Sequence, residues 1–245
     1  RWTLLRNPLD FLTEEEEAKA EPALRAGNRR RAKVVQLAAR RADVLVVPST
    51  GMAKRVIRVL PDLAGRVVMR HHPVAADSIP SLPRETAILC PVLFSPYKGM
   101  IDRIAELLAA MDDLADDTLR LRVTADRAEV PEALANNPRI DLVGRLDHRA
   151  LRELWARSRV IYFPPGVESF GYPLAEARVN GQPVIALDTE QNREVAGAAL
   201  FGFTIGDADS LRNAINRALT ANVGPDPTPF DPIAYFNWLL GPYQR

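Results

Sequence analysis

Glu168 and Glu176, which have seven residues between them, carry the clearest chemistry in the chain. An apolar run at 160–163 leads into Pro164-Pro165-Gly166, which predicts a buried strand that ends in a turn. A helix is predicted to begin at Tyr172. Glu168 should therefore lie on a loop at the carboxyl end of a strand, and Glu176 in the early turns of the next helix. Open α/β sheets bind their ligands at that edge.

These two positions suit a ligand that combines sugars with a diphosphate. The backbone N–H groups of residues 169–172 would be free at the start of the predicted helix, where the helix dipole attracts anions. Carboxylates accept hydrogen bonds from hydroxyl groups, so a carboxylate at Glu176 can bind ribose hydroxyls and one at Glu168 can hold the hydroxyls of a sugar. By itself the spacing favours a solvated surface pair, so the surrounding sequence has to decide.

The surrounding sequence resembles the donor-site signature of retaining family 4 glycosyltransferases of the GT-B fold, within the glycosyltransferases group 1. The resemblance is carried by Glu168-Ser-Phe-Gly-Tyr-Pro-Leu-Ala-Glu176 and by Asn180-Gly-Gln-Pro-Val-Ile-Ala186. Other parts of the same family are resembled by the segments Ala42–Ser49, Ser95–Gly99, Val143–Leu146 and Arg193–Val195. The similarity therefore extends over most of the chain.

The resemblance implies a function and a set of site residues. It implies that a sugar moves, with retention of configuration, from a nucleotide-diphosphate sugar to a hydroxyl of a glycan, lipid or small molecule. The donor would be a UDP- or GDP-sugar, and neither a metal nor another cofactor would be needed. Glu168 would position the sugar, and Lys98 would stabilise the departing diphosphate. The donor-binding residues would be Gly99, Gly144, Arg145, Leu146, Ser169, Phe170, Gly171, Tyr172 and Glu176.

Two features depart from the family pattern. The loop before Lys98 usually carries a glycine and an arginine where this chain has Val92 and Leu93, so Arg145 or another basic residue would have to replace that cation. Residues 1–8 resemble the interior of the family's N-terminal domain, so we expect the start of that domain to be missing. A non-catalytic nucleotide-binding or interaction module is therefore a second hypothesis, and a GT-B epimerase or phosphorylase fits the signature less well.

A parallel sheet is needed to position these residues, and the chain alternates apolar runs with amphipathic stretches. We predict an α/β, GT-B-like fold with a doubly wound, Rossmann-like C-terminal domain and a partial Rossmann-like N-terminal domain. Thr13 and Glu16 predict a capping box that opens a helix. Strands are predicted at residues 44–47, 66–69, 87–93, 119–124, 140–143, 160–163, 184–187 and 200–204. Helices are predicted at residues 29–41, 51–60, 99–111, 131–135, 148–157, 172–179, 192–196, 209–220 and 231–240.

Proline-rich segments mark the predicted domain boundaries. We predict a partial acceptor-side domain over residues 1–76, a linker over 77–84 and a nucleotide-sugar-binding domain over 85–224. A proline-rich turn and a terminal helix follow over 225–245. The resemblance implies that this helix crosses back to the first domain, and packing on its own domain is the alternative.

The composition excludes several other functions. The 245 residues carry a net charge of +1 and show no nucleic-acid-binding module, so no nucleic-acid partner is expected. The single cysteine, Cys90, lies in an apolar run, which indicates a buried side chain without a disulfide or metal role. No stretch is apolar and long enough to span a membrane, and no signal peptide is evident, so we expect a cytoplasmic protein. The oligomeric state stays open.

Two polar clusters each allow two interpretations. His71 and His72 are adjacent, and neighbouring strand residues point to opposite faces, so a linker or cleft role fits them better than a metal site. The basic segment Arg29–Arg41 fits a solvated helix face. It also fits a surface that associates peripherally with anionic headgroups at the inner face of a membrane.

Overall fold

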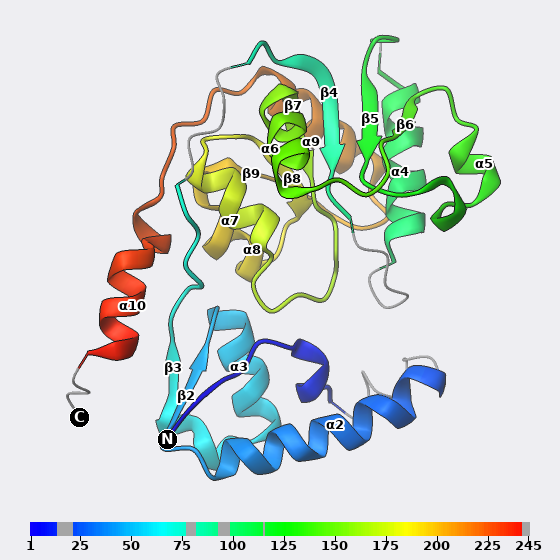
Figure 1. The fold of residues 1–245 in the computed structure, drawn as a ribbon. Coiled ribbons are helices and arrows are strands. Elements are labelled where there is room, and N and C mark those ends of the chain that lie inside the picture. Colours follow the sequence, from blue (N-terminus) through cyan, green and yellow to red (C-terminus); the bar gives the residue numbers. More distant parts are fainter. Residues whose placement is uncertain (14–21, 77–81, 93–98, 115, 242–245) are drawn as a thin grey trace. The chain divides into compact units, whose positions relative to one another are not determined.

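The structure, a computed structural model, describes residues 1–13, 22–76, 82–92, 99–114 and 116–241, except for the side chains of 22–26. The chain forms two compact units (Figure 1). The first unit contains Arg1–Pro73, Val167–Gly171 and Pro232–Arg245, and the second contains Val74–Gly166 and Tyr172–Asp231. Glu16 of the predicted capping box and Lys98 lie outside the described residues. The domain boundaries predicted from the sequence stay predictions.

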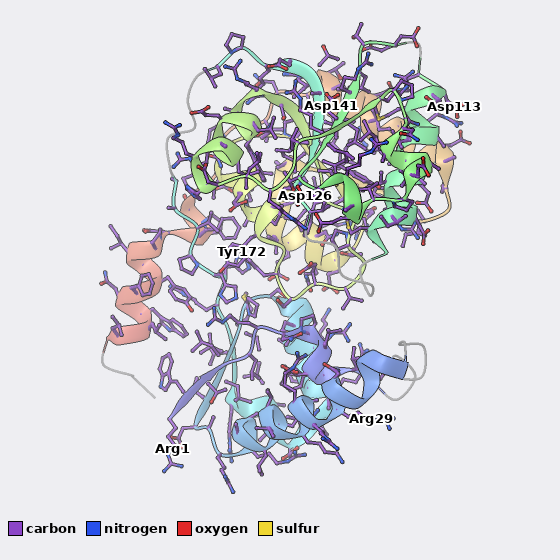
Figure 2. The ribbon with its side chains drawn as sticks, turned by 45° about the vertical axis from the view of Figure 1, so that its right-hand side comes forward. Arg1, Arg29, Asp113, Asp126, Asp141 and Tyr172 are labelled. Atoms are coloured by element: carbon purple, nitrogen blue, oxygen red, sulfur yellow. The ribbon has the colours of Figure 1, made fainter. Side chains whose placement is uncertain are left out.

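The first unit is built on a parallel three-stranded sheet with the order β1-β2-β3. Its central strand is buried along its whole length, because helices and turns cover it. Arg29 marks the long helix of this unit in Figure 2. The elements are β1 (Trp2–Leu4), η1 (Pro8–Phe11), α2 (Pro22–Arg40), β2 (Val44–Val47), α3 (Thr50–Val59), η2 (Pro61–Arg66) and β3 (Val67–Met69).

The terminal helix α10 (Pro232–Leu240) belongs to this first unit. The ring of Trp238 lies 5.1 Å from that of Trp2, and the Arg70 guanidinium lies 5.2 Å from the centre of the Trp238 ring. These aromatic and cation–π contacts attach the end of the chain to its beginning. Of the two alternatives for the terminal helix, the structure has the one in which it packs on the first part of the chain.

The second unit contains a parallel six-stranded sheet with the order β6-β5-β4-β7-β8-β9. The chain builds outward from β4 on one side and then continues from β7 on the other, so the strand order reverses between these two strands. This is the doubly wound arrangement, in which ligands bind beyond the carboxyl ends of the strands at the reversal point. The strands are β4 (Glu85–Cys90), β5 (Arg120–Val123), β6 (Ile140–Leu142), β7 (Ser158–Tyr162), β8 (Val184–Leu187) and β9 (Leu200–Phe203).

Helices follow the strands of this sheet in regular alternation, and the apolar faces of α4 and α9 form a core with alternate residues of the strands. Side chains from α4 and α9, including Ile104, Leu107 and Ile215, are fully buried there. The helical elements are α4 (Met100–Asp112), η4 (Arg127–Glu129), α5 (Glu132–Ala135), α6 (His148–Arg157), α7 (Tyr172–Val179), α8 (Glu190–Ala196), η5 (Gly197–Ala199), α9 (Ala208–Thr220) and η6 (Thr228–Phe230).

The predicted α/β, doubly wound fold is confirmed by these two parallel sheets. Cys90 is buried, and burial raises the pKa of its thiol, as its apolar run indicated. The strand β1 and the short η elements are absent from the prediction. The predicted helix at 29–41 begins earlier, at Pro22, and ends at Arg40.

Candidate functional site

The reversal point of the sheet lies between β4 and β7, which pair directly, so the carboxyl ends of these two strands are neighbours. The loop after β4 leads through residues 91–98 to α4, and the loop after β7 leads through residues 163–171 to α7. The first contains Lys98, and the second contains Glu168. In doubly wound sheets, ligands bind beyond the carboxyl ends of the strands at such a reversal point.

Glu176 lies on α7, in the second turn of the helix, and is half-buried. Its helix neighbours Leu174, Ala175 and Ala177 are fully buried, so the helix is fixed firmly against the unit. Burial raises the pKa of Glu176 from 4.5 to about 7. Its carboxylate has no hydrogen bond or ion pair with any residue that the structure describes. A partly desolvated carboxylate without a partner is an acceptor available to ligand hydroxyls.

The turn after α7 contains Gly181 and Gln182 of the second resembled segment, Asn180–Ala186, and the structure gives each a role. Gly181 has φ +60°, and a Cβ at this position would lie 2.6 Å from both the Pro225 nitrogen and the Val223 carbonyl oxygen, so only glycine fits. The Gln182 side chain donates hydrogen bonds to the carbonyls of Trp155 and Ser158, at 3.2 and 2.6 Å. These contacts fix the turn between α7 and β8 to the end of α6 and the start of β7, and so hold the helix that carries Glu176.

The loop of residues 167–171, which carries Glu168, lies in the first unit. The Ser49 hydroxyl donates a 2.6 Å hydrogen bond to the carbonyl of Ser169, and the same hydroxyl accepts from the Met52 N–H at the start of α3. Ser49 therefore both caps a helix and holds the loop. Glu168 itself is half-buried. Gly171, at the end of the loop, has φ +82°, which favours glycine.

Phe170 anchors the same loop. It is buried, and its ring centre lies 5.2 Å from that of His72 in an edge-on arrangement and 5.9 Å from that of His71. Burial, followed by the charges of Arg6 and His71, lowers the pKa of His72 from 6.5 to about 4. His72 is therefore neutral at physiological pH and packs as an aromatic side chain.

Three predicted residues follow β6, at 144–146. Gly144 has φ +69°, and its N–H donates to the Ala125 carbonyl at 3.1 Å. The Arg145 guanidinium donates to the carbonyls of Val92, at 2.9 Å, and of Thr124, at 3.2 Å. It thus lies at the carboxyl ends of β4 and β5, against the first residues of the loop that contains Lys98. Leu146 is half-buried.

Glu129 forms an ion pair with Arg145. The pKa of Glu129 is lowered, first by the hydrogen bond from the Asp126 N–H and then by Arg145. Gly99 stands at the start of α4 in the left-handed conformation, with φ +60°. Arg145 therefore supplies a half-exposed cation near the start of the loop that contains Lys98, but the Glu129 carboxylate already pairs with it.

The structure thus groups Gly99, Gly144, Arg145, Leu146, Tyr172 and Glu176 in the second unit, and Glu168, Ser169, Phe170 and Gly171 in the first. Ser49 and His72 were not predicted as loop contacts. The only sequence signal for Ser49 was its position at the end of a predicted strand. Over the described part of the chain, no three His, Cys, Asp or Glu side chains gather as a metal site would require.

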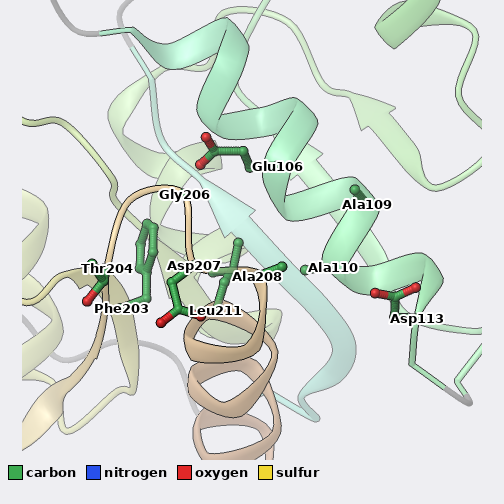
Figure 3. A pocket seen from close by; sticks show the side chains of 10 residues that line it. All are labelled: Glu106, Ala109, Ala110, Asp113, Phe203, Thr204, Gly206, Asp207, Ala208 and Leu211. Atoms are coloured by element: carbon green, nitrogen blue, oxygen red, sulfur yellow. The ribbon is translucent and has the colours of Figure 1, made fainter.

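A hollow of about 170 Å³ lies between α4 and the turn that leads into α9 (Figure 3). Its carboxylates already have partners: Glu106 pairs with Arg103, Asp113 pairs with Arg212, and Asp207 accepts from the Ser210 N–H. The residues that line the hollow include no lysine or arginine, so they offer a diphosphate no opposite charge. The hollow is therefore a poor candidate for the binding of a nucleotide.

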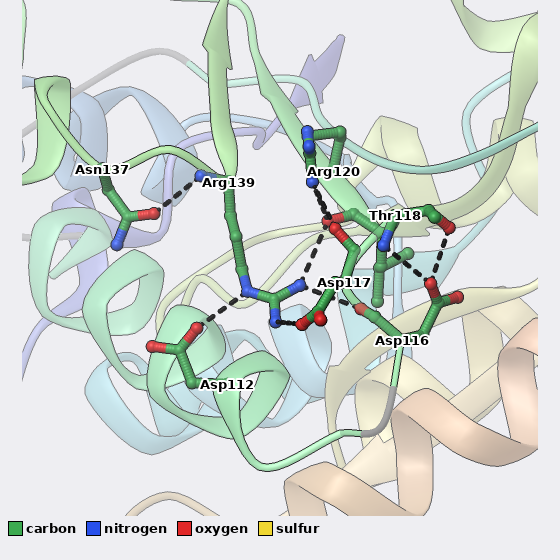
Figure 4. Close-up of polar contacts among 8 residues, drawn as sticks. Asp112, Asp116, Asp117, Thr118, Arg120, Asn137 and Arg139 are labelled. Carbon is green, nitrogen blue, oxygen red and sulfur yellow. Dashed lines mark hydrogen bonds and ion pairs between the residues drawn. The ribbon is translucent and has the colours of Figure 1, made fainter.

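A polar cluster around Arg139 lies at the amino ends of strands β5 and β6 (Figure 4). This buried guanidinium donates to Asp112 at 2.8 Å, to the Asp116 carbonyl at 2.9 Å and to Asp117 at 3.3 Å. The contacts tie the end of α4 to the starts of β5 and β6. Because every nitrogen of the guanidinium has a partner, we interpret this cluster as structural.

Comparisons with known proteins agree with the observed fold. The model of the family described as "Glycosyl transferases group 1" matches residues 92–221. No curated protein sequence matches the chain. No helix of the described chain combines the length and apolarity that a membrane span needs.

Solved structures resemble the chain in fold. The sucrose-phosphate synthase from Thermosynechococcus elongatus is 24% identical with a TM-score of 0.60, and the match covers 93% of this chain and 59% of that one. A UDP-forming α,α-trehalose-phosphate synthase from Burkholderia xenovorans is 14% identical with a TM-score of 0.64, covering 94% of this chain and 62% of that one. A lipopolysaccharide outer core galactosyltransferase is 18% identical with a TM-score of 0.61, covering 80% and 60%. The chain spans less than two thirds of each of these proteins.

Proposed function

The chain belongs to the group 1 glycosyl transferases, and from this membership we propose that it transfers a sugar from a nucleotide-diphosphate sugar to a hydroxyl acceptor, with retention of configuration. The observation that carries the proposal is Glu176, a carboxylate that is half-buried, unpaired among the described residues and placed on the helix after β7. Such a group is poised to accept hydrogen bonds from the ribose of a nucleotide.

The other predicted residues have roles around the same ligand. The N–H groups at the start of α7 and the cation of Lys98 stabilise the negative charge of the departing diphosphate. Glu168 holds the sugar hydroxyls in the orientation that transfer requires. The acceptor hydroxyl attacks the anomeric carbon on the face that the diphosphate leaves, and a phosphate oxygen takes its proton. No step of this scheme requires a metal ion.

Arg145 replaces the cation that the Val92-Leu93 position lacks. Its guanidinium already contacts the Val92 carbonyl, so a diphosphate bound in this loop would compete for it with Glu129 and with the Val92 and Thr124 carbonyls. The donor site is assigned to residues 85–224 and the acceptor side to residues 1–76. A UDP-sugar is the first donor to test, because one solved neighbour is described as UDP-forming and another, a pneumococcal O-GlcNAc transferase, was solved in complex with UDP and GlcNAc.

Calorimetric titration with UDP, GDP, ADP and TDP, first without metal and then with magnesium, tests the donor site. We expect one nucleotide to bind selectively without metal, and Glu176→Ala to abolish that binding while circular dichroism shows an intact fold. The matched control is Glu153→Ala, an exposed glutamate of another helix, α6. Equal binding by the Glu176 variant would refute the assignment.

Transfer of labelled sugar to any hydroxyl acceptor then separates an enzyme from a binding module. Selective nucleotide binding without transfer would favour the non-catalytic module. If no nucleotide binds at all, the interaction-module hypothesis replaces the donor site.

A further inference from the structure

The outward face of α2 has a composition that the fold of its unit does not explain. Residues 22–42 contain seven arginines and lysines and no aspartate or glutamate. The inward face is fixed by Ala32 and Ala39, which are buried, and by Gln36, which donates to the Asp10 carbonyl at 2.8 Å. The opposite face therefore points to solvent along the helix.

Two large apolar side chains lie in the middle of this solvent-facing side. Val34 is 69% exposed and Leu37 is 51% exposed. They are one turn apart, so they form one apolar spot on the helix surface. Exposed apolar side chains that stand together on an otherwise polar helix indicate a contact surface.

Basic side chains surround this spot. Arg30 lies four residues before Val34, Lys33 lies four residues before Leu37, and Arg41 lies four residues after Leu37, so each cation is one turn from the apolar pair. All three are exposed, and none has an ion-pair partner among the residues that the structure describes. By contrast, Arg31 pairs with Asp10 at 2.7 Å and serves the fold.

We propose that the outward face of α2, formed by Arg30, Lys33, Val34, Leu37 and Arg41, docks the protein on an anionic lipid surface. The cations lie at the level of the headgroups, and the two apolar side chains enter the boundary of the acyl chains. Charge complementarity selects the anionic partner, and the apolar spot selects a lipid over a nucleic acid or an acidic protein surface. This proposal does not depend on nucleotide binding, since its test measures only attachment to vesicles.

Sedimentation with vesicles tests the proposal with the full chain. We expect the chain to bind vesicles of phosphatidylcholine with 30% phosphatidylglycerol, and not vesicles of phosphatidylcholine alone. Each basic residue near an anionic surface strengthens attachment about fivefold, so the triple variant Arg30→Gln, Lys33→Gln, Arg41→Gln should bind about a hundredfold more weakly. Raising the salt from 0.1 M to 1 M should weaken binding of the wild-type chain, because the Debye length falls from about 10 Å to about 3 Å.

The matched control removes the same charge elsewhere. Arg58, Arg149 and Arg217 are exposed and lie on α3, α6 and α9, and their triple glutamine variant should keep most of the binding. Equal loss in the control would overturn the proposal, because it would show attraction by net charge alone. Equal binding of the wild-type chain to neutral vesicles, or no binding to either vesicle, would also overturn it.

Insertion is measured separately. A solvent-sensitive dye on Leu37→Cys should shift its emission to shorter wavelength on anionic vesicles, while the same dye on Asn213→Cys of α9 should not; the native Cys90 is fully buried and shielded from labelling. Heparin and single-stranded DNA serve as anionic competitors without an apolar phase. Binding to these polymers with no dye shift on vesicles would overturn a lipid partner in favour of a polyanion.

Discussion

Replacing Glu176 with glutamine should stabilise the free protein. Burial raises the pKa of this carboxyl from 4.5 to about 7, so between these pH values the folded chain keeps a proton that the unfolded chain releases. The contribution of this carboxyl to the free energy of unfolding is therefore complete below pH 4.5 and is lost as the pH rises to 7. A shift of this size corresponds to about 3 kcal/mol. Glutamine has the same shape and no charge, so the variant should exceed the wild type by up to about 3 kcal/mol at pH 8 and equal it at pH 4.5.

Nucleotide affinity should change in the opposite direction. Hydrogen bonds to a charged group contribute about 1.5–3 kcal/mol, so losing the carboxylate should raise the Kd for the nucleotide about 10- to 100-fold at pH 8. In the wild type a proton competes with the ligand for Glu176, whose pKa is about 7. The wild-type Kd should therefore be about twofold higher at pH 7, and about tenfold higher at pH 6, than its plateau above pH 8.

Calorimetry of both proteins at pH 6, 7 and 8, with urea unfolding at the same pH values, measures both effects. Ionisation of the nucleotide's own phosphates affects both proteins equally, so the ratio of their Kd values isolates the contribution of Glu176. We expect this ratio to shrink about tenfold from pH 8 to pH 6. A ratio that does not change with pH, or a glutamine variant no more stable than the wild type at pH 8, would refute the reasoning.

Three further substitutions test the supports of the site by urea unfolding. Ser49→Ala removes a helix cap and the hydrogen bond to the loop before α7, so it should lower the free energy of unfolding by about 2 kcal/mol. The control Asp147→Ala removes only a helix cap and should cost about 1 kcal/mol. Equal costs would show that Ser49 does not hold the loop. Gly181→Ala should cost about 3 kcal/mol because its Cβ meets backbone atoms at 2.6 Å, whereas Gly206→Ala has a similar positive φ but open space and should cost about 1 kcal/mol. Burial and the charges of Arg6 and His71 lower the pKa of His72 to about 4, so protonation of His72 should remove up to about 3 kcal/mol of stability as the pH falls from 6.5 to 4. His72→Leu should lose this pH dependence, and a variant with the wild-type pH profile would contradict the reasoning.

Elements fixed by local sequence were predicted closely. Four elements have the predicted bounds: the strands at 44–47 and 184–187 and the helices at 148–157 and 172–179. The residues that start, fill and end each of them are neighbours in the sequence. The strand β1 is only three residues long, too short for a period, and it exists because it pairs with β2. The helix α2 starts seven residues before the predicted Arg29, since Gly27 and Asn28 interrupt the pattern without ending the helix.

The candidate site was predictable as far as its motif is local. The positions of Glu168 and Glu176, after a strand and on a helix, follow from neighbouring residues. The hydrogen bond between Ser49 and Ser169 joins residues 120 positions apart, and no pattern in either segment predicts it. The burial of Glu176, and with it the raised pKa, depends on how α7 packs, which a spacing pattern does not contain.

The membership of residues 167–171 in the first unit has a consequence for any attempt to take the protein apart. The chain passes between the two units four times, at Pro73/Val74, Gly166/Val167, Gly171/Tyr172 and Asp231/Pro232. A protease cut within 77–81 would therefore leave the first unit assembled from both fragments, the loop and α10 coming from the larger one. Neither half can be expressed whole as one continuous stretch, and a gene split at the predicted linker should yield two pieces that complement each other.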